Sequence, residues 1–411
     1  MGVVCNRSYQ RLMLAFAVIG VILMIYIYVV DMHIRNKKTS FGGGYLTFLY
    51  PNQVIDTDNM SKSNKKYARI RQINAHAGDS EIMNVRDDMM VPGPNAWIPY
   101  PVKRNPSGPF LIKMMNGEGI KYTNYTFYPL TFNSSLLINN ANICKDTDNL
   151  TFLIMVHTAV LHFDRRKALR ETWANPRLLK NHSSRIIFLL GKPKDNISQN
   201  ALDLESEQFK DIVQGDFIDD YHNLTHKGIL GYRWIVTYCE NAKLIFKIDD
   251  DVFVNIFMVI HELLPKYEEG QRIIACRVLT NETIAREGKF AVDPDYFPGY
   301  QRSPLQYCPG PFVLMLRNLV PEMYESAKRI PFYWVDDFYL YGLLPNQIRN
   351  ISFHFLGNVD NNEQNALKCF LGQNPCKYLA AYAWTQGVMY KYWSATLVMY
   401  KDLVQKYAKV V

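Results

Sequence analysis

Four short apolar runs, separated by stretches of helical character, constrain the fold of this chain most. The runs are Phe152–Val156, Arg185–Leu190, Asp211–Phe217 and Lys243–Ile248. The stretches between them, which we predict to be helices, are Arg165–Trp173, Gln199–Lys210 and Asn223–Glu240, with Gly191 ending the second strand. Strands separated by helices of this length form α/β domains, so we expect a mostly parallel sheet flanked by helices. Ligands of such sheets bind beyond the carboxyl ends of the strands.

Three consecutive acids, Asp249, Asp250 and Asp251, follow the fourth predicted strand directly. Adjacent carboxylates repel one another unless water or a cation neutralises them. Alternate residues of an extended segment project to one side, so Asp249 and Asp251 are expected to face one site while Asp250 points elsewhere. Oxygen ligands suit magnesium, manganese or calcium. A solvated acidic turn is the alternative, but the buried strand before the acids and the apolar Val252–Val254 after them favour a cation site.

A second acidic pair, Asp336 and Asp337, lies within the aromatic segment Pro331–Gly342. Restricted hydration raises the pKa of a carboxyl group, and a raised pKa suits a general base. The alternative is a pair of N-cap acids that begin a helix over Phe338–Leu344. The segment by itself leaves these two interpretations open.

Two arginines, Arg166 and Arg170, stand four residues apart and therefore share a helical face. Guanidinium groups in this arrangement bind phosphate or stack on a base. Ordinary surface salt bridges are the alternative, and the spacing does not decide between them.

An ordered set of motifs resembles a known family over roughly residues 144–400. The motifs are Arg166-x-x-x-Arg170-x-Thr172-Trp173, Phe188–Gly191, Asp211–Phe217, Tyr221-x-Asn223-Leu224-Thr225-x-Lys227, Lys247–Val254, Tyr307-Cys308-x-Gly310 and Asp336–Phe338. Their order and spacing are similar to those of the beta-1,3-galactosyltransferase and beta-1,3-N-acetylglucosaminyltransferase family, which includes the Fringe enzymes. The resemblance implies a GT-A fold, a UDP-sugar donor, manganese and a Golgi type II membrane anchor.

The resemblance also implies roles for individual residues. Asp251 matches the chief metal ligand, Asp249 a metal or nucleotide contact, and Asp337 the catalytic base. The remaining candidates for the nucleotide-sugar site are Thr158, Arg166, Arg170 and Asp250, whereas Thr172 and Trp173 are expected to be structural.

This sequence departs from the family at three places. Asp336 stands where relatives have glutamate, and the stretch Pro309–Phe312 is one residue shorter, which affects expected acceptor contacts. Many relatives carry a late histidine near the metal, but Tyr378–Tyr392 contains none. His354 is the one histidine after Asp337 and therefore a weak candidate for the metal.

The sequence pattern of the N-terminal part predicts a membrane anchor. Leu12–Val30 is uncharged and apolar, and as a helix it would extend about 28 Å, roughly the thickness of a hydrocarbon core. No small-residue cleavage site follows it, which favours an uncleaved anchor over a signal peptide. We therefore expect a cytosolic tail over residues 1–11, an anchor over 12–30, a partly disordered stem over 31–143 and a lumenal catalytic domain over 144–411.

Sequons and cysteines favour a lumenal C-terminal side. The sequons after the predicted anchor begin at Asn59, Asn124, Asn133, Asn149, Asn181, Asn196, Asn223, Asn281 and Asn350. Cys5 precedes the anchor, and the other six of the seven cysteines follow it. Six cysteines allow 15 pairings, among which the sequence does not choose.

The function we predict is transfer of galactose or an N-acetylhexosamine from a UDP-sugar to a glycan acceptor on a glycoprotein or glycolipid, with inversion and a beta-1,3 linkage. The net charge of +8 is spread along the chain, which indicates a solvated basic surface and no nucleic-acid partner. The alternatives are an inactive relative that acts as a lumenal chaperone or glycan-binding protein, and a calcium-stabilised ectodomain.

Overall fold

The computed structural model describes residues 103–104, 110–113, 119–122, 126–127, 135–145, 147, 149–292, 294, 296–330 and 332–409. The predicted tail and anchor over residues 1–30 lie outside these residues. In the described part, no helix is both long enough and apolar enough to cross a membrane.

An eight-stranded sheet organises the described residues, with strand order β13-β11-β12-β9-β6-β7-β8-β5. The strands are β5 (Leu136–Ile138), β6 (Leu150–His157), β7 (Ser184–Lys192), β8 (Ile212–Ile218), β9 (Ala242–Asp249), β11 (Ile273–Cys276), β12 (Phe312–Leu316) and β13 (Ser352–Phe355). Strands β9, β6, β7 and β8 pair in parallel, as predicted. Strand β12 runs antiparallel between β9 and β11, and β5 pairs antiparallel with β8. A segment of the predicted stem, β5, is therefore part of the central sheet.

Helices cover both faces of the sheet. The longer ones are α4 (Phe163–Glu171), α5 (Asn196–Phe209), α6 (Leu224–Tyr238), α8 (Val320–Ala327), α10 (Glu363–Phe370), α11 (Gln386–Met399) and α12 (Lys401–Tyr407). On one face, a Cβ on Gly231 of α6 would lie 2.4 Å from the sulfur of Met155 and 2.6 Å from Leu189. On the other face, the Arg170 guanidinium of α4 lies 4.6 Å from the centre of the Phe188 ring.

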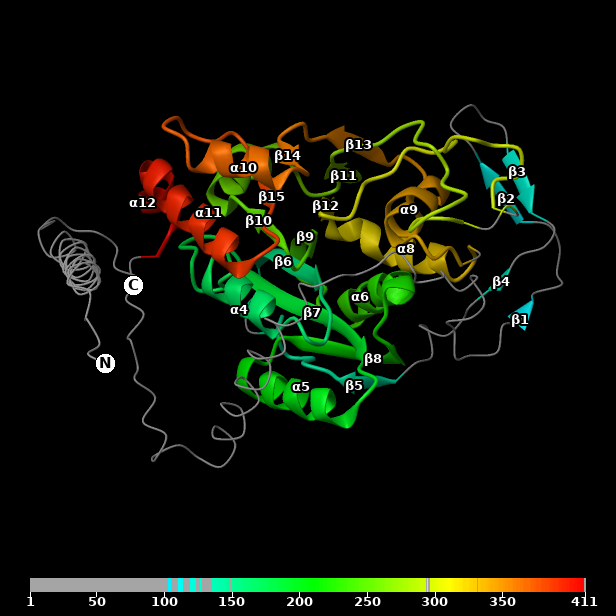
Figure 1. The fold of residues 1–411 in the computed structure, drawn as a ribbon, viewed down its shortest axis with the longest axis horizontal. Coiled ribbons are helices and arrows are strands. Elements are labelled where there is room, and N and C mark those ends of the chain that lie inside the picture. The colour runs from blue at the N-terminus through cyan, green and yellow to red at the C-terminus, as the bar shows by residue number, and fades with distance from the viewer. Residues whose placement is uncertain are drawn as a thin grey trace, which may run out of the picture. The chain divides into compact units, whose positions relative to one another are not determined.

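A smaller sheet has the order β10-β15-β14 and extends the fold beyond β9. Its strands are β10 (Val252–Val254), β14 (Val359–Asp360) and β15 (Ala380–Tyr382). Figure 1 shows α10, α11 and α12 grouped beside these strands. Two further strand pairs form earlier in the chain, β1 (Lys103–Arg104) with β4 (Thr126–Phe127) and β2 (Phe110–Lys113) with β3 (Gly119–Tyr122).

Two details of the sequence-based prediction are wrong. Gly191 does not end β7, which continues to Lys192. The glycine serves a close approach instead, because a Cβ there would lie 2.6 Å from the carbonyl oxygen of Phe217. The predicted helix over Phe338–Leu344 is a short α-helical turn, α9 (Asp336–Phe338), followed by a π-helical turn, Tyr339–Leu343.

Three disulfides select one of the possible cysteine pairings. They are Cys144–Cys239, Cys276–Cys308 and Cys369–Cys376. The second bond joins the end of β11 to the segment before β12, and so closes the loop between these two strands.

A buried ion network fixes α4 against the sheet. Arg166 is fully buried, and its Nε and Nη2 atoms donate to the Glu205 carboxylate at 3.0 and 2.6 Å. Arg170 donates to Glu205 at 2.7 Å and to Asp211 at 2.7 and 2.8 Å. Because every charge in the network has an opposite partner, the cost of burying it is offset.

We predict that Glu205→Gln destabilises the protein by about 3–5 kcal/mol, because it leaves two buried guanidinium groups short of negative charge. The exposed pair Arg272–Glu322, joined at 2.7 and 2.9 Å, provides a matched control. Glu322→Gln should cost no more than about 1 kcal/mol. Urea unfolding of both variants checks this, and equal losses would contradict the role of the network.

Candidate active site

The three acids lie where the two central parallel strands end. Asp249 is the last residue of β9 and is paired in register with His157, the last residue of β6. Asp250 and Asp251 follow immediately. The acids therefore occupy the carboxyl edge of the sheet, the expected location for a ligand site.

Asp250 is bound on several sides by residues at the start of α4. Its carboxylate accepts hydrogen bonds from Thr158 Oγ1 at 2.6 Å and Arg165 Nη1 at 2.8 Å, and lies 2.7 Å from His162 Nδ1. Burial acts to raise the pKa of Asp250, but these partners outweigh it and hold the pKa at about 2. The side chain points toward α4 and fastens the acidic run to that helix. The expected alternation is not kept, because Asp250 and Asp251 lie in a turn after β9 and Arg165 Nη1 contacts both carboxylates.

Asp251 is less well compensated. Arg165 Nη1 donates to its carboxylate at 3.0 Å, and its backbone oxygen accepts from Ala383 N at 2.7 Å. Burial and the charges of Asp249 and Asp250 raise the pKa of Asp251 to about 6, despite the arginine. This edge of the sheet therefore holds an excess of negative charge that a cation would stabilise.

The buried ammonium of Lys247 joins the acidic run to the second acidic pair. Its Nζ donates to Asp249 at 2.9 Å and to the Gly310 carbonyl at 2.8 Å, and lies 3.8 Å from Asp337 Oδ1. Burial alone would lower the pKa of Lys247, but the charges of Asp249, Asp337 and Asp336 raise it. The lysine thus remains charged and holds Asp249 and Asp337 on either side of it.

Asp336 and Asp337 lie in the first turn of α9, after Val335 at the N-cap position. The N-cap interpretation of these acids is therefore wrong. Burial raises the pKa of both carboxyl groups. The Asp337 side chain is 29% exposed and that of Asp336 14%, so Asp337 is the more accessible. Gly310 permits this close approach, because a Cβ there would lie 2.1 Å from Asp337 Oδ1 and displace it.

The predicted arginines form their ion pairs with Glu205 and Asp211, although Arg166 Nη1 also donates at 3.4 Å to Thr158 Oγ1, the donor to Asp250. Arg166 and Arg170 belong to the buried network with Glu205. This agrees with the salt-bridge alternative, except that these ion pairs are buried and do not lie at the surface. Their neighbour Arg165 contacts the acids instead. The adjacency of Arg165 and Arg166 was the only sequence signal, and periodicity alone does not show which of two adjacent residues faces a site.

The tail of the chain also reaches the acids. Strand β15 pairs with β10, and the Trp384 carbonyl accepts a hydrogen bond from Arg165 at 3.4 Å. The ring of Trp384 is 53% exposed and stacks on Tyr382 with centroids 5.1 Å apart. His354 instead lies on β13, at the far edge of the large sheet and three strands from β9.

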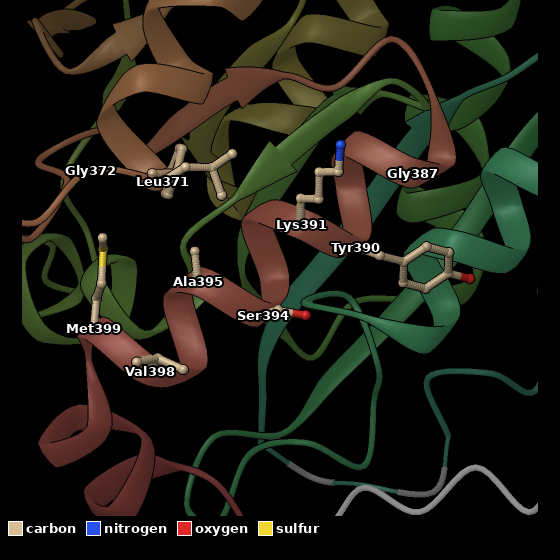
Figure 2. A pocket seen from close by; sticks show the side chains of 10 residues that line it. Leu371, Gly372, Gly387, Tyr390, Lys391, Ser394, Ala395, Val398 and Met399 are labelled. Carbon is tan, nitrogen blue, oxygen red and sulfur yellow. The ribbon is translucent and has the colours of Figure 1, made fainter. Parts of the chain in front are cut away.

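A groove of about 520 Å³ lies elsewhere, between the end of α10 and α11. Figure 2 shows Lys391 and Ala395 of α11 projecting toward the side of Leu371. Its lining is mainly apolar, with Val398 and Met399 at one end. The groove is thus separate from the acidic cluster.

Comparisons with known proteins show which family this chain resembles. The galactosyltransferase family model matches residues 164–353, which include both acidic clusters and α4 except its first residue. Beta-1,3-galactosyltransferase 1 of Homo sapiens is 31% identical over 260 residues, which cover 62% of this chain and 77% of the relative. Lactosylceramide 1,3-N-acetyl-beta-D-glucosaminyltransferase of Mus musculus is 31% identical over 225 residues, covering 52% of this chain and 58% of the relative.

A solved structure of the galactosyltransferase LgtC with donor and acceptor sugar analogs covers 63% of this chain and 97% of its own, with 9% identity and a TM-score of 0.31. A likeness this low supports no conclusion. The sequence relatives, by contrast, are 31% identical to this chain over 225 to 260 residues. The chain belongs to the galactosyltransferase family and is a glycosyltransferase.

Proposed function

We propose that the protein is an inverting hexosyltransferase that transfers galactose or an N-acetylhexosamine from a UDP-sugar to a glycan acceptor in a beta-1,3 linkage. The observation that carries this proposal is the contact of Lys247 with both acidic clusters. It lies 2.9 Å from Asp249 and 3.8 Å from Asp337. The Asp337 carboxylate, whose pKa is raised, therefore lies near the acidic end of β9, because both are close to the same lysine.

The reaction is a single displacement in which Asp337 acts as general base. Asp337 takes the proton of an acceptor hydroxyl, and the oxygen forms a bond to the anomeric carbon of the donor sugar. The bond between that carbon and the diphosphate breaks from the opposite side, and UDP leaves with the electron pair. One displacement inverts the anomeric centre. Base assistance of this kind contributes about 10²–10⁴-fold to the rate.

A divalent cation, manganese by family resemblance, fits Asp249 and Asp251. Their carboxylates are hard oxygen donors, and the pKa of Asp251 is raised by burial and then by the charges of Asp249 and Asp250. The described residues contain no cluster of three or more His, Cys, Asp or Glu side chains arranged for a metal. Asp249 and Asp251 would be the residues that hold the cation, which suits the carboxylate-poor sites of magnesium-like ions. When bound, the cation would neutralise charge on the leaving diphosphate.

The intact acidic clusters do not favour the alternative of an inactive chaperone or glycan-binding relative. Such a protein would have no need of a carboxylate whose pKa is raised next to a buried lysine. A calcium-stabilised ectodomain predicts stabilisation by calcium without turnover of any UDP-sugar.

We further propose a Golgi membrane protein with a tail over residues 1–11, an anchor over 12–30, a stem that ends before β5, and a lumenal catalytic domain that begins with β5, earlier than the predicted boundary at residue 144. The positions of the sequons are compatible with a lumenal domain. Within the described residues, Asn149, Asn181, Asn196, Asn281 and Asn350 are exposed. Asn223 is 3% exposed and its Nδ2 donates to the Ile218 carbonyl, so it cannot carry a glycan in this fold.

Asp337→Asn should lower transfer by about 10²–10⁴-fold and leave UDP affinity unchanged, because the amide cannot take the acceptor proton. Asp336→Asn, at the less exposed acid, should have a smaller effect. In the wild type, burial raises the pKa of the base, so activity should rise with pH through that raised pKa and be lost below it. Initial rates and UDP titrations check this. Near-normal transfer by Asp337→Asn would leave the base unassigned.

Asp251→Asn should abolish manganese binding in calorimetry and weaken UDP binding in the presence of manganese, while the thermal midpoint without metal stays the same or rises. The rise is possible because the substitution relieves repulsion with Asp249 and Asp250. Asp402→Asn, at an exposed acid of α12, is the control. Unchanged manganese affinity in Asp251→Asn would exclude this residue as a ligand.

In sealed microsomes, residues 31–411 should resist added protease and lose mass on deglycosylation. Asn223→Gln should not change the number of glycans. Asn350→Gln, at an exposed sequon, is the matched comparison and should lower that number. Cleavage of the C-terminal part by external protease would refute the proposed orientation.

A further inference from the structure

Three aromatic side chains, Tyr221, His222 and Trp334, form what we call the aromatic shelf. The His222 and Trp334 ring centroids are 4.8 Å apart, and Tyr221 packs edge-on against Trp334 at 6.3 Å. Tyr221 begins the short turn that precedes α6, while Trp334 lies two residues before Asp336. Two segments distant in sequence thus meet beside the acidic pair.

Hydrogen bonds hold the Trp334 side of the shelf in place against α6. Thr225 Oγ1 in the first turn of α6 donates to the Tyr333 carbonyl at 2.8 Å and to the Trp334 carbonyl at 3.2 Å. Trp334 Nε1 donates to the Ala291 carbonyl at 3.2 Å. Side chains fixed in this way lose little further conformational entropy when a ligand binds.

The shelf is open to solvent and close to the base. Tyr221 is 41% exposed. The pKa of the Tyr221 phenol is raised, first by the burial of the rest of this side chain and then by the charges of Asp336, Asp337 and Asp249. An exposed aromatic ring within electrostatic reach of a catalytic carboxylate is a suitable surface for the substrate that the carboxylate deprotonates.

Lys289 covers the Tyr221 ring. Its ammonium lies 4.4 Å from the ring centroid, and the side chain is exposed. It comes from the loop between β11 and β12 that the Cys276–Cys308 disulfide closes. A cation–π contact at an exposed site is weak, so a ligand could replace the lysine on this ring at little cost.

We propose that the aromatic shelf is the acceptor subsite, on which the apolar face of a neutral, β-linked hexopyranoside stacks against Tyr221 and Trp334 with a hydroxyl directed to Asp337. This inference rests on the proposed glycosyl transfer. Tyrosine and tryptophan offer a large apolar surface with a polar edge, which suits a sugar ring. Lys289 moves aside and does not recognise the acceptor.

The test uses the full-length protein in detergent, with methyl β-D-galactopyranoside and methyl N-acetyl-β-D-glucosaminide as probes. Tyr221→Ala should raise the acceptor KM by about 5- to 10-fold, a typical effect of losing one aromatic contact. UDP affinity should not change, and Tyr221→Phe should behave like the wild type because it keeps the ring. Phe355→Ala, at a 67% exposed aromatic residue of β13, is the matched control and should have no effect.

Saturation-transfer NMR with the same probes and UDP provides a readout that does not require turnover. If the wild type saturates the sugar protons and Tyr221→Ala does not, the shelf is supported. This holds even if no UDP-sugar is turned over, because the absence of turnover would refute only the proposed function. An unchanged acceptor KM and unchanged saturation in Tyr221→Ala would overturn the inference. A loss in Lys289→Ala as large as in Tyr221→Ala would also overturn it, because recognition would then depend on charge.

Discussion

The rest of the site depends on the contacts of the buried Lys247 ammonium. A buried charge is costly unless it is paired and hydrogen-bonded, and Lys247 meets this condition through Asp249, Asp337 and the Gly310 carbonyl. The same contacts fix the distance between the end of β9 and the start of α9. Because Gly310 has no side chain, the loop before β12 can approach both charged groups. The lysine therefore connects the acidic strand end that we propose holds the donor with the proposed base.

A second layer of buried charges supports this arrangement from the other side. The pairing of Arg166 with Glu205 positions α4 on the sheet. The start of this helix then places His162 and Arg165 against Asp250. The fully satisfied Asp250 in turn leaves Asp249 and Asp251 as the acids available for a ligand. The different environments of the three acids thus follow from the packing of α4.

Local patterns predicted the framework of this protein well. Apolar runs of strand length define β6, β7, β8 and β9, since burial on both faces leaves little choice of residue, and the ordered motifs identified the family. The phase of α4 was not predictable. The partners that turn Arg166 inward and leave Arg165 at the acids lie far away in sequence. Lys247 had a recognisable signal, since a lysine within an otherwise apolar buried strand requires a partner. The approach of Ala383 and Trp384 to Asp251 and Arg165 had none, because it depends on the pairing of β15 with β10.

The anomeric configuration of the product tests the central claim most directly. Wild-type protein is incubated with α-configured UDP-galactose or UDP-N-acetylglucosamine and a methyl β-glycoside, and the new linkage is analysed by proton NMR. Single displacement assisted by Asp337 predicts a β-linked product, and the proposed linkage attaches it at the 3-hydroxyl. An α-linked product would contradict the account, because retention requires a different chemical course from the one that this pair of acidic clusters supports.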